Sequence, residues 1–129
     1  WSKLIVNVGI NALVALLRVP NGALIASPAS EELMRDAVAE ALAVAKALGI
    51  DLDYTSQQAR VRQVCELTRL NRASMLQDIL RGRSTEIDVI NGAIVAKGIE
   101  AGLPTPINLM LTRLIKALES TSAQRIDVL

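Results

Sequence analysis

Three polar residues interrupt the apolar N-terminal segment at intervals of four. Lys3, Asn7 and Asn11 lie in WSKLIVNVGINAL, where most of the other residues are apolar. On a helix with roughly 3.6 residues per turn, side chains spaced by four differ in direction by only about 40° per step, so the three form one stripe. An ammonium group is a pure donor, whereas an amide both donates and accepts. The stripe therefore has the chemistry of a binding site.

The apolar surroundings of this stripe indicate a helix that is mostly buried. Burying an unpaired lysine costs several kcal/mol, and each unsatisfied buried amide costs roughly 1–3 kcal/mol. The stripe must therefore face polar partners or a wet cleft. A solvated edge of the domain is the alternative, but exposed helix positions favour Glu, Lys and Gln over Asn. We therefore treat Lys3, Asn7 and Asn11 as candidate functional residues.

A second polar group lies in SMLQD and RSTEID. Ser74 and Asp78 are spaced by four and share a face of a short predicted helix, and Glu86 follows. Each residue also has a structural interpretation. Ser74 could cap its helix with Gln77 as the partner, Asp78 could pair with a nearby arginine, and Glu86 could complement a helix dipole. Residue by residue, these structural interpretations are favoured.

Helical periodicity runs through the chain and predicts a compact all-α bundle of about six helices. Ser27 or Ser30 is positioned to cap the second helix, and Thr55 with Gln58 has the spacing of a capping box at the third. The predicted helices cover 2–17, a segment that follows SPASEEL and ends at Gly49, a segment that begins at Thr55, 74–80, 86–101 and 107–119. Ala and Leu are abundant in these segments, and glycines mark several of their ends. The alternation of apolar and polar residues that is typical of strands is not sustained anywhere.

The composition excludes several classes of function. The 129 residues suit one domain, and 14 basic against 13 acidic residues offer no electrostatic case for a nucleic-acid or membrane partner. The sequence contains no histidine, which rules out Ser/His/Asp and Cys/His catalysis and disfavours a metal site. The single Cys65 fits a reducing, cytoplasmic setting, and we expect a buried, inert thiol. No Gly-rich phosphate loop occurs in the sequence.

Taken together, the two polar groups resemble a known family. The pattern W-x-K-x-x-x-N-x-x-x-N, the PNG turn, SMLQD, GRSTEIDVINGAIVAKG and AGLPTP at 101–106 resemble the C-terminal helical domain of ketopantoate reductases. The resemblance covers most of the chain. It implies that 1–129 is the substrate-binding, catalytic domain of an NADPH-dependent 2-dehydropantoate 2-reductase, an oxidoreductase of pantothenate and coenzyme A biosynthesis. It also implies that the N-terminal Rossmann domain of such an enzyme is missing from this sequence.

The resemblance assigns a role to each residue of the helical stripe. Lys3 matches the lysine that acts as general acid. Asn7 and Asn11 match amides that hold the substrate, and Ser74 matches a hydroxyl that binds its polar end. A ketone that accepts a hydride becomes an alkoxide, which needs a proton and a nearby positive charge, and a lysine ammonium supplies both. The stripe is then the helical wall of an active-site cleft.

The remaining assignments concern the acidic residues and the partners. Glu86 matches the acidic residue of the TEID motif, placed near the substrate and the nicotinamide end of the cofactor. Asp78 matches an aspartate of the substrate pocket that could orient Lys3. The implied partners are a 2-oxo acid, NADPH bound mainly by the missing domain, that domain itself, and possible formation of a homodimer. Two alternatives stay open: a family relative that reduces another 2-oxo acid or ketone, and a non-catalytic helical dimerisation module.

Overall fold

The computed structural model describes residues 1–126, which form six α-helices and three short 3-10 turns, with no strand in that range. The α-helices are α1 (Ser2–Leu17), α2 (Pro28–Ala47), α3 (Tyr54–Leu67), α4 (Ser74–Leu80), α5 (Asn91–Ala101) and α6 (Pro106–Ser120). The 3-10 turns are η1 (Asn21–Ile25), η2 (Ile87–Val89) and η3 (Ser122–Gln124). The prediction of an all-α domain with six helices is confirmed. Within 1–126, no helix is both long and apolar enough to cross a membrane.

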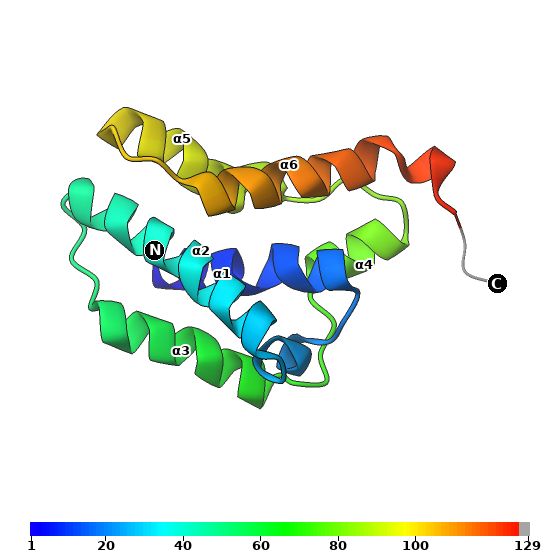
Figure 1. Cartoon of the computed structure of the whole chain (residues 1–129), viewed down its shortest axis with the longest axis horizontal. Helices are drawn as coiled ribbons and strands as arrows, with labels where there is room; N and C mark the ends of the chain where they lie inside the picture. The colour runs from blue at the N-terminus through cyan, green and yellow to red at the C-terminus, as the bar shows by residue number, and fades with distance from the viewer. Residues whose placement is uncertain (127–129) are drawn as a thin grey trace.

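The first helix runs through the middle of the molecule and packs against α2, α3, α4 and α6 (Figure 1). Half of its sixteen residues are buried, which accounts for its apolar composition. Gly9 lets three helices approach one another closely. A Cβ atom at this position would lie 2.8 Å from Val38 Cγ2 of α2 and 2.9 Å from Val61 Cγ1 of α3. The absence of a side chain at Gly9 therefore sets how tightly α1 sits in the core.

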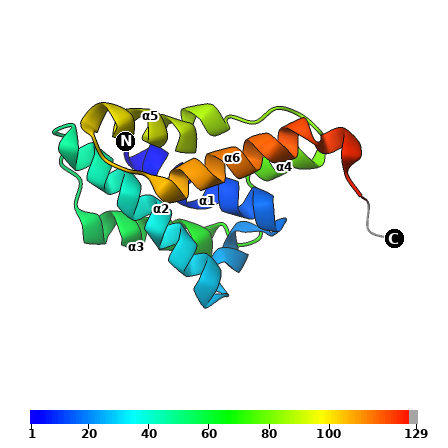
Figure 2. The same cartoon turned by 45° about the horizontal axis from the view of Figure 1, so that its top comes forward.

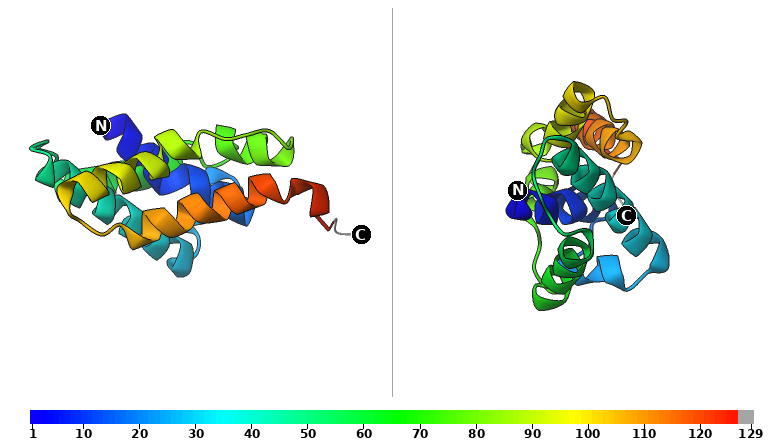
Figure 3. Two further views of the ribbon diagram at one scale, coloured as in Figure 1. Left: turned by 90° about the horizontal axis from the view of Figure 1, so that it is seen from above. Right: turned by 90° about the vertical axis from the view of Figure 1, so that its left-hand side faces the viewer.

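The last two long helices form a hairpin that covers one side of α1. Figure 2 shows α6 lying across α1, and the view from above in Figure 3 shows α5 and α6 side by side, joined by the turn at 102–105. Gly102 ends α5 in the left-handed conformation, with φ 71°. Ile94 of α5 and Ile115 of α6 are fully buried. The hairpin therefore carries its own share of the hydrophobic core.

The predicted capping residues are partly wrong. Asp53, not Thr55, caps α3, because its carboxylate accepts a hydrogen bond from the Ser56 N–H at 2.8 Å. Gln58 is buried instead, and its Nε2 donates to the Arg35 carbonyl of α2 at 2.9 Å. The stretch DYTSQQ contains two overlapping cap patterns, and Asp53, two residues before Thr55, occupies the N-cap position. Gln58 joins two helices rather than closing a capping box.

The predicted fifth helix is broken near its start. Regular α-helix begins at Asn91, and the residues before it form the 3-10 turn η2, with a bend at Ile90 (φ −110°, ψ −95°). Gly92 allows this bend. A Cβ there would lie 3.2 Å from the Ile87 carbonyl oxygen, which folds back over the first turn of α5. Glu86 therefore lies in a turn ahead of η2 and not in the first turn of a long helix.

Candidate functional site

The stripe on α1 stays accessible in the structure. Lys3 is exposed, and Asn7 and Asn11 are half-buried. Among residues 1–126, none of the three side chains makes a hydrogen bond or an ion pair with another part of the chain. The two amides and the ammonium thus remain available on a helix whose other faces are largely buried. Lys3 lies near the start of α1 with its ammonium in solvent, so the stripe faces water rather than polar partners inside the protein, which is one of the two surroundings expected for it.

The second pair of candidate residues lies on α4, which packs against α1 (Figure 1). Met75, Leu76 and Ile79 bury one face of this short helix. Ser74 is exposed at its first position, and no side-chain bond caps the helix there. The suggested capping box with Gln77 is therefore absent, since the Gln77 amide donates to the Arg72 carbonyl at 2.9 Å.

Asp78 is half-buried on α4 and has a partner within the chain. Its Oδ1 lies 3.5 Å from Arg83 Nη2, so the interpretation of Asp78 as a member of an ion pair is confirmed. The Arg83 side chain is 57% exposed and the Asp78 side chain 25% exposed, so water reaches the pair from the Arg83 side. Exposed pairs of this kind contribute little to stability, so the contact does not tie Asp78 to a purely structural role.

Glu86 is exposed, and its side chain caps no helix. The turn that carries it is anchored from α6 at two points. Glu119 Oε2 accepts a hydrogen bond from the Thr85 N–H at 2.6 Å, and Lys116 Nζ lies 3.0 Å from Asp88 Oδ1. The backbone on both sides of Glu86 is therefore held, while its carboxylate makes no hydrogen bond or ion pair with residues 1–126.

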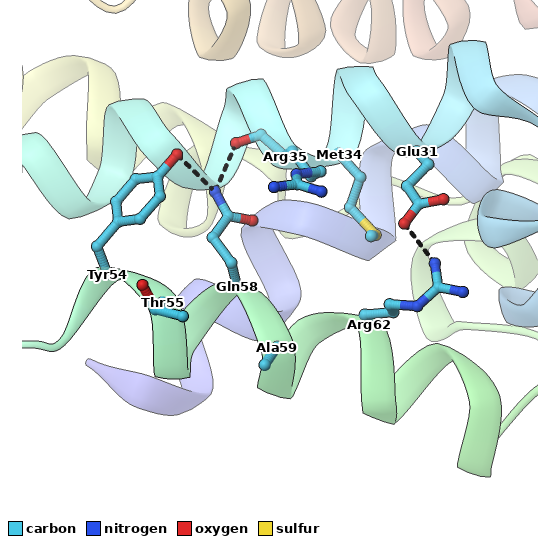
Figure 4. Close-up of a pocket in the computed structure, with 8 residues that line it drawn as sticks. All are labelled: Glu31, Met34, Arg35, Tyr54, Thr55, Gln58, Ala59 and Arg62. Carbon is cyan, nitrogen blue, oxygen red and sulfur yellow. Dashed lines mark hydrogen bonds and ion pairs between the residues drawn. The ribbon is translucent and has the colours of Figure 1, made fainter.

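The six candidate side chains thus come from three neighbouring segments: α1, α4 and the Glu86 turn. No hydrogen bond or ion pair in the described part of the chain joins any two of them. A cavity of about 240 Å³ between α2 and α3 contains none of them (Figure 4). Its floor is formed by Met34 and Gln58, and the Glu31–Arg62 ion pair closes one end. The candidate residues are exposed or half-buried and do not line this cavity. We refer to the surface that carries them as the open face.

A buried polar network that the sequence analysis did not predict lies behind α1. Asn91 Nδ2 donates to the Val8 carbonyl at 3.2 Å and to Asn108 Oδ1 at 3.0 Å. Asn108 Nδ2 donates in turn to the Ala37 carbonyl and to Glu40 Oε1. The only signal of this network in the sequence is the placement of Asn91 and Asn108 directly after isoleucines of the core.

Cys65 is completely buried on α3, as predicted. Its Sγ lies 3.7 Å from Met34 Sδ. Burial raises the pKa of the thiol to about 11, with charges of neighbouring side chains contributing less. Because only the thiolate is a good nucleophile, Cys65 does not take part in chemistry at neutral pH.

Comparison with known proteins identifies the family of this chain. The sequence model of the family described as "Ketopantoate reductase PanE/ApbA C terminal" matches residues 1–119. The chain belongs to this family. A relative from Archaeoglobus fulgidus, named 2-dehydropantoate 2-reductase, is 42% identical over 120 residues. That match covers 93% of this chain and 40% of the relative, so the chain spans about two fifths of the length of that relative.

Several solved structures match the fold of this chain closely. A ketopantoate reductase from Ralstonia eutropha JMP134 matches with a TM-score of 0.88 and 36% identity, over 95% of this chain and 41% of that one. D-mandelate dehydrogenase in a ternary structure with NADH and anilino(oxo)acetate matches equally well, with a TM-score of 0.88 and 35% identity over 93% and 40%. A dimeric ketopantoate reductase from Staphylococcus aureus matches with a TM-score of 0.84 and 25% identity, over 94% and 42%.

Proposed function

We propose that this chain is the C-terminal, substrate-binding domain of an NADPH-dependent 2-dehydropantoate 2-reductase, which reduces ketopantoate to pantoate. The observation that carries the proposal is the free stripe of Lys3, Asn7 and Asn11 on an otherwise buried helix of a ketopantoate reductase domain. Within residues 1–126 these three hydrogen-bonding groups have no partner, and three such groups in one accessible line suit a small polar ligand. The enzyme that contains this domain would act in the cytoplasm.

In this proposal Lys3 is the general acid. When bound, NADPH supplies the hydride that reduces the carbonyl carbon of the substrate. The carbonyl oxygen gains negative charge as the C=O double bond opens. The Lys3 ammonium stabilises that charge and transfers one proton to the oxygen, which completes the alcohol. The exposure of Lys3 in this domain supports the proposal, because the neutral amine can recover its proton from water.

The other residues of the open face hold the substrate. Asn7 and Asn11 carry both donors and acceptors, which suits a molecule with a carboxylate, a ketone and a terminal hydroxyl. The exposed hydroxyl of Ser74 is proposed to bind the polar end of the substrate. Asp78 contributes a negative charge to the open face and is proposed to orient either the substrate hydroxyl or Lys3.

The domain fits only one end of the cofactor. The free carboxylate of Glu86 can accept hydrogen bonds from hydroxyl or amide groups, as found at a nicotinamide and its ribose. A carboxylate repels the pyrophosphate, and the sequence contains no Gly-rich phosphate loop. We therefore propose that Glu86 contacts the nicotinamide end and the reacting centre, while a Rossmann domain of the same enzyme binds the rest of NADPH. A homodimer is a further proposal, which the dimeric relative supports.

Another 2-oxo acid is the second candidate substrate. The similarity to D-mandelate dehydrogenase equals that to the Ralstonia enzyme in TM-score and nearly in identity. The stripe is proposed to contact the 2-oxo acid group, which ketopantoate shares with an aryl-substituted 2-oxo acid. A reductase for an aryl-substituted 2-oxo acid is therefore compatible with the same open face, and the cofactor would then be NADPH or NADH.

The test is a steady-state assay of the intact two-domain enzyme that contains this chain. NADPH and NADH oxidation would be measured with ketopantoate, benzoylformate and shorter 2-oxo acids. We expect kcat/KM to be highest with ketopantoate and NADPH. Higher kcat/KM with benzoylformate would assign the enzyme to the second candidate. Absence of turnover with every 2-oxo acid, in an enzyme that binds NADPH, would favour a non-catalytic dimerisation module and end the proposal.

A further inference from the structure

A buried pair of amides joins α1 to the α5–α6 hairpin. Asn91 is the first residue of α5, Asn108 lies in the first turn of α6, and both are 0% exposed. Asn91 Nδ2 donates to Asn108 Oδ1 at 3.0 Å and to the Val8 carbonyl at 3.2 Å. Val8 follows Asn7 of the stripe directly. In the described part of the chain, the Asn91–Val8 contact is the one hydrogen bond between α1 and the hairpin.

The amide pair is fixed from its far side by α2. Glu40 accepts hydrogen bonds from the Ile107 and Asn108 N–H groups and from Asn108 Nδ2, each at 2.9 Å. Asn108 Nδ2 also donates to the Ala37 carbonyl at 3.0 Å. Asn108 therefore has no freedom to rotate away, and it presents its Oδ1 to Asn91 in one orientation.

The same hairpin carries the Glu86 turn. The Ile87 carbonyl packs over Gly92, next to Asn91, and the Thr85 N–H is held by Glu119 near the end of α6. Glu86 is thus attached to the hairpin, whereas Lys3 and Asn7 belong to α1. The relative position of the two halves of the proposed site depends on how α1 and the hairpin are aligned.

Apolar packing alone does not define that alignment well, because it is non-directional, whereas a hydrogen bond fixes direction and distance. We propose that Asn91 is a positioning residue that sets the register between the stripe on α1 and the Glu86 turn. The proposal rests on the proposed function, since it concerns the two walls of that site. Asn91 itself is fully buried and does not touch the substrate.

The experiment compares Asn91→Ala with Gln58→Ala in the intact enzyme. Gln58 is a matched control, because it is also a buried amide that donates to a helix carbonyl, but it joins α3 to α2, away from the hairpin. We expect Asn91→Ala to raise KM for ketopantoate and to lower kcat/KM by at least about 10-fold, since misplacement near 1 Å can cost up to about 10²-fold. KM for NADPH should change by less than about twofold, because the cofactor is proposed to be held mainly by the other domain.

The KM values separate positioning from simple destabilisation. A variant that is partly unfolded contains less active enzyme, yet the molecules that remain folded keep the wild-type KM. Gln58→Ala should show this second pattern. Asn91→Ser, which retains one donor, should fall between Asn91→Ala and wild type in KM for ketopantoate, and it serves in place of the alanine variant if that does not fold.

Three outcomes would overturn the inference. Wild-type KM for ketopantoate in a folded Asn91→Ala enzyme makes Asn91 purely structural, and so does failure of both Asn91 variants to fold. An intact wild-type enzyme without activity on any 2-oxo acid instead refutes the proposed function, and the positioning role falls with it. The wild-type assay therefore distinguishes failure of the function from failure of this inference.

Discussion

Lys3 is the only cation in the stripe of α1, and it makes no hydrogen bond or ion pair within the described chain. We predict that Lys3→Ala in the intact enzyme lowers kcat by at least roughly 10²-fold, because the general acid is lost. Its exposure predicts that the free energy of unfolding changes by no more than about 0.5 kcal/mol. Turnover and Tm should be measured on the same preparation. As a control, Lys46→Ala removes another exposed lysine and should leave kcat unchanged. Near-wild-type turnover of a folded Lys3→Ala enzyme would remove Lys3 from the mechanism.

The buried thiol of Cys65 makes a pH-dependent contribution to the stability of the native protein, and its reactivity can be measured. Because burial raises its pKa from 9.0 to about 11, the native protein holds the thiol proton more tightly than the unfolded chain does. The stabilisation from this group is complete below about pH 9 and is lost as the pH rises toward 11. We predict that a thiol reagent labels the native protein slowly at pH 8 and labels it fast in denaturant. A native labelling rate close to that of the unfolded chain would show that the thiol is accessible.

At the scale of helices, Gly9 sets the crossing of α1 with α2 and α3. Replacing glycine by alanine inside a helix usually stabilises it by about 1 kcal/mol. Here we predict the opposite sign, a loss of roughly 1–3 kcal/mol, because the new Cβ would lie 2.8 Å from Val38 Cγ2. The measurement is urea unfolding of Gly9→Ala, Val38→Ala and the double variant. The double variant should lose less than the sum of the single losses, since Val38→Ala vacates the contact. Strict additivity would count against this account of the crossing.

Helix boundaries could be predicted where local residues determine them. The limits Ser2–Leu17 and Ser74–Leu80 match the structure, because apolar periodicity and neighbouring turn residues mark both ends. The start of α5 could not be read in the same way, since the bend at Ile90 depends on a carbonyl that packs onto Gly92. The cap of α3 could not be decided from the sequence, because Asp53 and Thr55 are both N-cap residue types with a polar residue three positions later, and in the structure Thr55 lies inside the helix.

The candidate site was likewise predictable only where local sequence determines it. The stripe on α1 follows from spacing alone, and its accessibility agrees with the expectation of a wet face. The roles of Ser74, Asp78 and Glu86 rested on family resemblance and stay proposals. The bond from Asn91 to Val8 joins positions 83 residues apart in sequence, so no local pattern could reveal it. Long-range pairing of polar groups appears only once the helices are placed.

At the scale of the whole molecule, the domain is proposed to supply only one wall of the active site. We predict that the purified 129-residue chain alone oxidises no NADPH with ketopantoate, because it has no phosphate-binding loop. It should nevertheless show the helical circular dichroism of a folded protein. The intact enzyme at the same concentration is the positive control. Turnover by the isolated chain would show that this domain holds the complete cofactor site.

Glu40 also bears on the order in which the chain folds. The first turn of α6 receives no side-chain cap from Thr105, and two of its N–H groups are satisfied instead by a carboxylate 67 and 68 residues earlier in the sequence. A peptide of α6 alone lacks that cap and would fray at its start. During synthesis, α2 leaves the ribosome before α6, so the acceptor is in place when the last helix emerges. We therefore expect the C-terminal helix to dock late in folding, onto a core that already contains α2.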